Sequence, residues 1–212
     1  MRRIFNITVL VLALALVPES ASAQFDLSKV LGGLFGGSSK STTTTTPTTD
    51  PYKKLADAAP AVSTINATWI YNSASFAYVG SNPLADVVIA QLDPIILDVL
   101  SQMGVSSGSA TLKLDNGKAI VSQGDSALGC KYSYDRSKAR VVVSAVIEQK
   151  SVSVTGYVKY ASSTLSVMLD VKEVIKAVKT VYPDYKNDQH VVLIETLLKD
   201  MGDVYVVGKF KK

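Results

Sequence analysis

The feature of this sequence that most constrains its fold is a change of hydrophobic period at Gly108. Just before it, apolar residues recur at helical spacing, and from there to Asp170 they recur at every second position. A period of two is typical of β-strands that bury one face. Short polar links join these segments, which places consecutive strands side by side in antiparallel order. After a first hairpin, the predicted strands are 128–134, 141–147, 151–161 and 164–170.

The first hairpin is marked by Asn116-Gly117, because both residues tolerate the positive φ of a tight two-residue turn. Such a loop pairs Asp115 with Lys118 and Leu114 with Ala119. Apolar side chains then share one face, and an opposite-charge pair lies at the rim. A three-residue loop would set Leu114 against Lys118, so the sequence favours the two-residue loop.

A strand and a long helix are predicted before the hairpin. Residues 66–79 have an extended, aromatic-rich pattern. Asn82 is a suitable helix cap, Pro83 suits the first helical position and Gly104 suits the stop. Because proline lacks a backbone N–H, Pro94 is predicted to kink or divide this helix.

The remaining elements complete the fold prediction. A short helix over 52–65, broken near Pro60, is expected before the first strand. Helices over 171–182 and 188–201 and a last strand over 203–210 are expected at the end. This order predicts a strand-rich α+β fold. If the last strand pairs with the first, the sheet closes into an antiparallel barrel without exposed edges. An open curved sheet with helices on one face is the alternative.

The first 23 residues have the pattern of a secretory signal peptide. Arg2 and Arg3 precede an apolar run over 7–17, and Ala21-Ser22-Ala23 forms a small-residue cleavage signal. Cleavage is expected between Ala23 and Gln24. The protein is therefore expected to be exported and to be periplasmic, outer-membrane-associated or extracellular. No later stretch is long and uncharged enough to predict a transmembrane helix.

Two appendages are expected between the cleavage site and the domain. Residues 24–37 form a short apolar leader with paired glycines, which is either an unstructured segment or a docking peptide for an envelope protein or a membrane surface. Residues 38–51 form a Ser/Thr-rich linker with no apolar side chains to bury. The folded domain is then 52–212.

Charge and composition exclude several functions. The chain carries a formal net charge of +4, and removal of 1–23 leaves 20 basic and 17 acidic residues. Such a small, evenly spread excess does not indicate nucleic-acid binding. Cys130 is the only cysteine and His190 the only histidine, so no disulfide, multi-histidine metal site or catalytic histidine pair is expected. Cys130 is predicted to be a buried strand thiol, and neither catalysis nor a cofactor is expected.

Candidate ligand-binding residues come from the aromatic strands, because ligand cavities are mostly apolar and aromatic. Ordinary core packing is the alternative interpretation for all of them. The candidates are Trp69, Tyr71, Phe76, Tyr78, Tyr132 and Tyr134. The acidic residues Asp86, Asp93 and Asp98 are interpreted as a solvated helix face.

Several segments together resemble an uncharacterised lipocalin-like family (a domain of unknown function) of secreted Bacteroides-type proteins. They are the leader and linker, the Thr68-Trp69-x-Tyr71 motif, the Ser-Asn-Pro-Leu-Ala run over 81–85, and the last strand. The resemblance implies a lipocalin-like antiparallel barrel or half-barrel with inserted helices, and no catalytic residues. Ala67 stands where lipocalins commonly have the glycine of Gly-x-Trp. Ser126, in Asp-Ser-Ala, is similar to the O-glycosylation sites of exported Bacteroides proteins.

Two functions fit these observations. The first is an exported domain that binds a small apolar or amphipathic ligand inside the barrel. The second is a structural or protein-interaction module of the cell envelope with no ligand cavity. A continuous cavity lined by aromatic residues would favour the first, and an interior at native packing density would favour the second.

Overall fold

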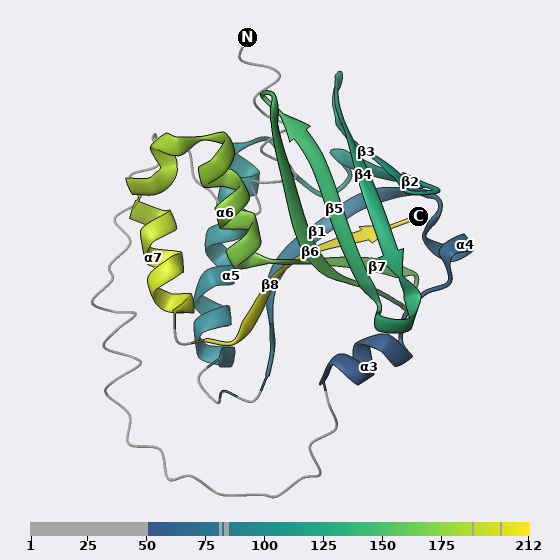
Figure 1. Ribbon diagram of the computed structural model, residues 1–212, viewed down its shortest axis with the longest axis horizontal. Helices are drawn as coiled ribbons and strands as arrows, with labels where there is room; N and C mark the ends of the chain where they lie inside the picture. The colour runs from purple at the N-terminus through teal and green to yellow at the C-terminus, as the bar shows by residue number, and fades with distance from the viewer. Residues whose placement is uncertain (1–50, 81, 83–84, 188, 200) are drawn as a thin grey trace, which may run out of the picture.

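In the computed structural model, which describes residues 51–80, 82, 85–187, 189–199 and 201–212, eight antiparallel strands form a closed barrel with the longer helices packed at one side (Figure 1). The strands are β1 Thr68–Val79, β2 Ala110–Asp115, β3 Lys118–Gln123, β4 Ser126–Asp135, β5 Arg140–Ile147, β6 Lys150–Ala161, β7 Thr164–Asp170 and β8 Asp203–Lys211. Each strand pairs with the next, and β8 pairs with β1. The strand-rich α+β prediction is confirmed, and the closed barrel is the correct one of the two predicted arrangements.

The helices occupy the positions expected from the sequence. They are α3 Pro51–Asp57, α4 Val62–Ile65, α5 Ala85–Gln102, α6 Val171–Val181 and α7 Gln189–Leu198, with 3₁₀ turns η1 Arg136–Lys138 and η2 Pro183–Asn187. The predicted signal peptide with its cleavage site at Ala23 and Gln24, the leader 24–37 and the linker 38–51, apart from its last residue, lie outside the described residues.

Pro94 was predicted to kink or divide the long helix; division is wrong, because α5 continues through Pro94 as one helix. A proline inside a helix removes one backbone hydrogen bond. Here Leu92, Ile96 and Leu100 are almost fully buried on the face that packs on the barrel. Burial of such side chains stabilises a structure by about 1.5–3 kcal/mol each, which offsets the missing bond.

The Asn116-Gly117 hairpin has the predicted geometry. Both residues have positive φ, 42° and 85°, as a two-residue turn of this kind requires. The register pairs Asp115 with Lys118 and Leu114 with Ala119. The local sequence therefore determined this pairing without help from the rest of the fold.

The barrel closes over only part of the length of β1. Its first residues pair with β2 over three positions, Thr68 to Ile70, whereas nine positions from Ile70 to Val79 pair with β8. Among the described residues, the second edge of β1 beyond Ile70 therefore has no neighbouring strand. Helix α5 packs along this part of β1, and the backbone N–H of Phe76 donates to Asp93 Oδ1 at 2.5 Å. Asp93 is half-buried, unlike Asp86 and Asp98, so its assignment to a solvated face is corrected.

A second exposed edge is covered in the same way. The first half of β6 pairs with β5 alone among the described residues, because β7 ends at Asp170. Helix α6 begins at the next residue, with Asp170 as its cap accepting from the Glu173 backbone N–H at 2.9 Å. The Glu173 carboxylate in turn accepts from the backbone N–H of Thr155 on β6. Asp93 of α5 and Glu173 of α6 thus each accept a hydrogen bond that a neighbouring strand would otherwise accept.

Helix α3 lies against the outer face of the barrel. Tyr52 packs on Tyr157 with ring centroids 5.5 Å apart, and its hydroxyl donates to Asp203. Tyr157 contacts Tyr205 edge-on, and burial raises the pKa of Tyr205 far above its ordinary value.

None of the described helices has the length and apolar character needed to cross a membrane.

We expect Asp93→Ala to reduce the free energy of unfolding by about 1–3 kcal/mol, because it leaves the half-buried N–H of Phe76 without an acceptor. Asp93→Asn should cost less, since its amide oxygen can still accept. Chemical denaturation measures both. Asp86→Ala, on the exposed face of the first turn of the same helix, is the control for charge removal and should cost less than about 1 kcal/mol. Equal losses for Asp93→Ala and Asp86→Ala would contradict the edge-capping role.

Candidate functional site

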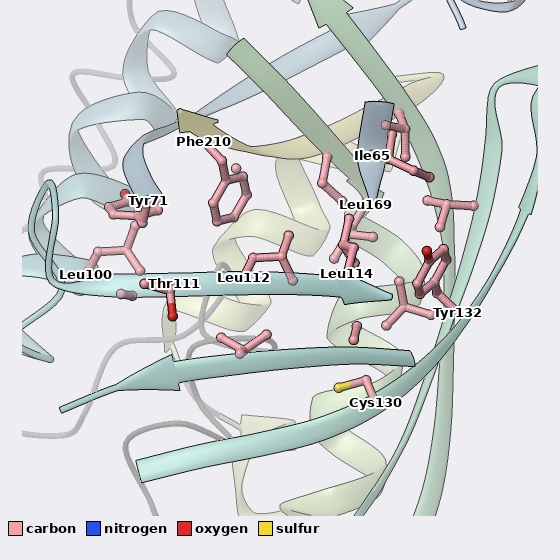
Figure 2. Close-up of a pocket in the computed structure, with 18 residues that line it drawn as sticks. Ile65, Tyr71, Leu100, Thr111, Leu112, Leu114, Cys130, Tyr132, Leu169 and Phe210 are labelled. Carbon is pink, nitrogen blue, oxygen red and sulfur yellow. The ribbon is translucent and has the colours of Figure 1, made fainter. Parts of the chain in front are cut away.

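A cavity of about 110 Å³ lies inside the barrel (Figure 2). All eight strands contribute to its lining, so it lies on the barrel axis. Its strand residues are Tyr71, Ala110, Thr111, Leu112, Leu114, Ala119, Val121, Cys130, Tyr132, Val141, Val143, Val158, Val167, Leu169, Gly208 and Phe210. No lining residue is charged. The cavity therefore suits an uncharged, apolar group.

Two helices close the ends of the cavity. Ile65 of α4 lies at the end that holds Tyr132, and Leu100 of α5 lies at the other end beside Tyr71 (Figure 2). Ile65 and Leu100 are both almost fully buried. Since each end is covered by an apolar side chain from outside the sheet, the cavity does not open directly along the barrel axis.

The segment 60–67 is tied across the α4 end by aromatic residues of the strands. Trp69 Nε1 donates to the carbonyl of Ile65 at 2.9 Å, and the Tyr132 hydroxyl donates to Asn66 Oδ1 at 2.9 Å. The Tyr134 hydroxyl donates to the carbonyl of Pro60, also at 2.9 Å. The Trp69 ring is buried and the rings of Tyr132 and Tyr134 are partly buried, while the polar atom of each fixes the cover.

Several contacts hold the Trp69 side chain in place. It is fully buried, its ring meets Tyr160 edge-on with centroids 5.9 Å apart, and Lys212 Nζ lies 4.9 Å from the ring centroid. This cation–π contact ties the end of the described chain to the start of the first strand. Trp69 is therefore part of the closed end rather than of the cavity wall.

The polar groups that reach the cavity are held in their neutral forms. Burial raises the pKa of Tyr71 to about 12 and that of Cys130 to about 11. The Tyr71 ring packs edge-on against Phe210 at 6.0 Å between centroids. A neutral phenol and a neutral thiol are weak nucleophiles near pH 7.

The six aromatic candidates separate into three groups. Tyr71 and Tyr132 line the cavity. Trp69 and Tyr134 hold the cover instead. Phe76 and Tyr78 lie on the part of β1 that pairs with β8 alone, where the Tyr78 hydroxyl accepts from the backbone N–H of Asn82 at 3.0 Å.

The ligand-binding residues predicted from the sequence are all aromatic, so they omit most of the cavity wall, which is aliphatic. The period-two pattern already placed Leu112, Leu114 and Val141 on an inward face. The pattern does not distinguish these cavity-lining residues from other inward-facing residues of the strands. The buried state of Cys130 was predicted and is confirmed.

Two further candidates can be placed. Ser126 is the first residue of β4, next to the turn at Gly124-Asp125, and is partly exposed. Its glycosylation stays a prediction. Among the residues that the structure describes, no group of three or more His, Cys, Asp or Glu could hold a metal ion.

Comparison with known proteins gives one match. The model of a family described as a lipocalin-like domain (DUF4923) matches residues 40–212. Neither the curated proteins nor the solved structures contain a significant match.

We expect Tyr134→Phe to lower the free energy of unfolding by about 0.5–1.5 kcal/mol, because it removes the hydroxyl that holds Pro60. Hydrogen exchange in 60–67 should accelerate, while exchange in the central strands changes less. Tyr160→Phe is the matched control, since the structure shows no hydrogen bond from the Tyr160 hydroxyl to another described residue, and it should change stability by less than about 0.5 kcal/mol. If hydrogen exchange in 60–67 is unaltered in Tyr134→Phe, the Tyr134 hydroxyl does not hold this segment in place.

We expect the Cys130 thiol to resist modification in the folded protein at pH 8. Because burial raises its pKa to about 11, roughly one thiol in a thousand is ionised at that pH, and only the thiolate reacts. Labelling with a chromogenic disulfide should be complete only in denaturant, and should accelerate in the folded state as the pH rises towards 11. Rapid labelling at pH 8 without denaturant would contradict the prediction.

Proposed function

The chain belongs to the lipocalin-like domain family DUF4923, and we propose that it is an exported binding protein that holds a small apolar ligand inside its barrel. The observation that carries the proposal is the cavity on the barrel axis, whose lining includes no charged side chain. An interior filled to native density would have favoured the alternative, a structural module with no ligand cavity.

The size of the cavity restricts the ligand. Cavities for drug-sized ligands usually measure about 300–1,000 Å³, whereas an apolar cavity of about 150 Å³ can hold benzene. The 110 Å³ found here therefore suits a single ring or a short hydrocarbon chain. The Tyr132 hydroxyl is bonded to Asn66, so we assign any polar contact with the ligand to Tyr71, and a ligand with one hydroxyl or carbonyl group also fits.

Binding rather than catalysis agrees with the chemistry of the wall. General acid–base catalysis needs a group whose pKa lies near the working pH. Tyr71 and Cys130 both have a pKa raised well above neutrality, and the lining includes no carboxylate or histidine. The proposal therefore assigns these residues to ligand contact alone.

The proposed export rests on the sequence of residues 1–23, with cleavage between Ala23 and Gln24. The leader 24–37 is then the new N-terminal segment, and its apolar residues would serve as a docking peptide for an envelope protein. Mass spectrometry of the exported protein tests the cleavage site, and fractionation of a 24–37 deletion tests the docking role. A mature chain that still begins at Met1 would refute the export proposal.

We expect short n-alkanols and benzene to shift the methyl NMR resonances of Leu112, Leu114 and Val141. Val167→Phe should abolish these shifts, because a ring at this position on β7 would occupy the cavity. Ile70→Phe is the matched control, since Ile70 is exposed on the outer face of β1, and it should leave binding unchanged. If none of these probes shifts the resonances of the native protein, the proposed function is wrong.

A further inference from the structure

The wall of the barrel has a break between β4 and β5. Their pairing runs only from Lys131 with Ser144 to Asp135 with Arg140. Among the described residues, 126–130 of β4 pair with β3 alone, and 145–147 of β5 pair with β6 alone. Figure 1 shows the β3–β4 and β5–β6 hairpins standing apart at the top of the view. We call this break the seam.

A groove of about 670 Å³ lies over the seam. Its lining includes outward-facing residues, such as Ile120 and Val146, which are 41% and 65% exposed. It also includes the inward-facing, buried residues Ala119, Cys130 and Ala145. In a strand the two sets point to opposite faces, so the groove lies over the outer face of these strands and also reaches residues whose side chains point inwards.

The groove and the cavity share a wall. Ala119 and Cys130 line both. Helices α4 and α5 cover the two ends of the cavity, and at the seam the groove and the cavity have wall residues in common. A ligand in the cavity could extend through the seam into the groove.

The charged residues that line the groove are both positive. Among the described residues that line it, Lys118 and Lys131 alone are charged, and both are exposed. They lie directly opposite each other in the β3–β4 register, and like charges in this arrangement destabilise a sheet. Lys118 also faces Asp115 on β2, whereas Lys131 faces Ser144. In the part of the chain that the structure describes, neither lysine forms an ion pair. A bound anion would relieve their repulsion.

We propose that the seam is the entrance to the cavity and that Lys118 and Lys131 bind the anionic head group of a short, single-chain amphiphile. The hydrocarbon chain passes through the seam, beside Ala119 and Cys130, and ends in the apolar cavity. This inference rests on the proposed function, since it needs an apolar group inside the barrel. It adds a charged head group and a lateral route of entry.

The head-group site is tested with octanoate and 1-octanol, which share a chain but differ in charge. The variant Lys118→Gln/Lys131→Gln should bind octanoate roughly five-fold more weakly than the native protein, as expected for exposed ion pairs, and 1-octanol equally well. Lys54→Gln/Lys159→Gln removes the same charge from α3 and β6 and should leave both affinities unchanged. Raising the salt concentration should weaken octanoate binding alone. Calorimetry measures each affinity.

The entrance is tested at Gly129, on the outer face of β4. A Cβ at this position meets no atom within 4 Å, so a side chain can start there, and we expect the indole of Gly129→Trp to occupy the groove. Association of octanoate and 1-octanol should slow by roughly ten-fold or more, within the range that interface mutations produce. Ser133→Trp, exposed on the same strand beyond the seam, is the matched control and should not alter the rate. Bound octanoate should also slow the alkylation of Cys130.

The outcomes separate this inference from the proposed function. If 1-octanol binds but the lysine variant binds octanoate as tightly as the native protein, the head-group site is wrong and the cavity proposal stands. If Gly129→Trp leaves the association rates unchanged, the entrance lies elsewhere. If neither probe binds the native protein, the inference and the proposed function both fail.

Discussion

Every backbone N–H and C=O in the sheet needs a partner, and the architecture of this protein depends on how that requirement is met where strands are missing. β1 extends past β2, and β6 extends past β7, so each has an edge without a neighbouring strand. Asp93 of α5 and Glu173 of α6 accept hydrogen bonds from these edges. The helices are therefore joined to the barrel by hydrogen bonds as well as by apolar contacts. The seam between β4 and β5 has no such carboxylate from a helix among the described residues, and it is there that we place ligand entry.

The aromatic residues have a role of their own in the barrel, which follows from their chemistry. Tyrosine and tryptophan combine a large apolar surface with one polar atom. At the α4 end of the barrel, Trp69 is buried, Tyr132 and Tyr134 are partly buried, and all three donate to residues 60–66. The cavity itself is lined mainly by aliphatic side chains, which have no polar atom to satisfy. An interior of this kind can hold an apolar group without leaving buried polar groups unpaired.

Much of the fold could be predicted from the sequence because its signals are local. The two-residue turn at Asn116-Gly117 fixes the register of its hairpin, and alternation fixes which residues of each strand point inwards. The site was harder to predict because a cavity is a property of the whole barrel. Tyr71 and Phe76 are equally aromatic and equally inward-facing, yet only Tyr71 lines the cavity. Their difference comes from the unequal lengths of β1 and β2, which no local pattern encodes.

The sequence by itself determined the strands, the helices, the turn chemistry, the uncharged inner face and the burial of Cys130. These follow from short-range periodicity and side-chain type. The tertiary structure decided that Pro94 stays inside one helix, that Asp93 turns inwards, and that β4 and β5 separate above Lys131 and Ser144. Each of these depends on contacts between residues far apart in the chain, where buried apolar surface and unpaired backbone groups outweigh local preference.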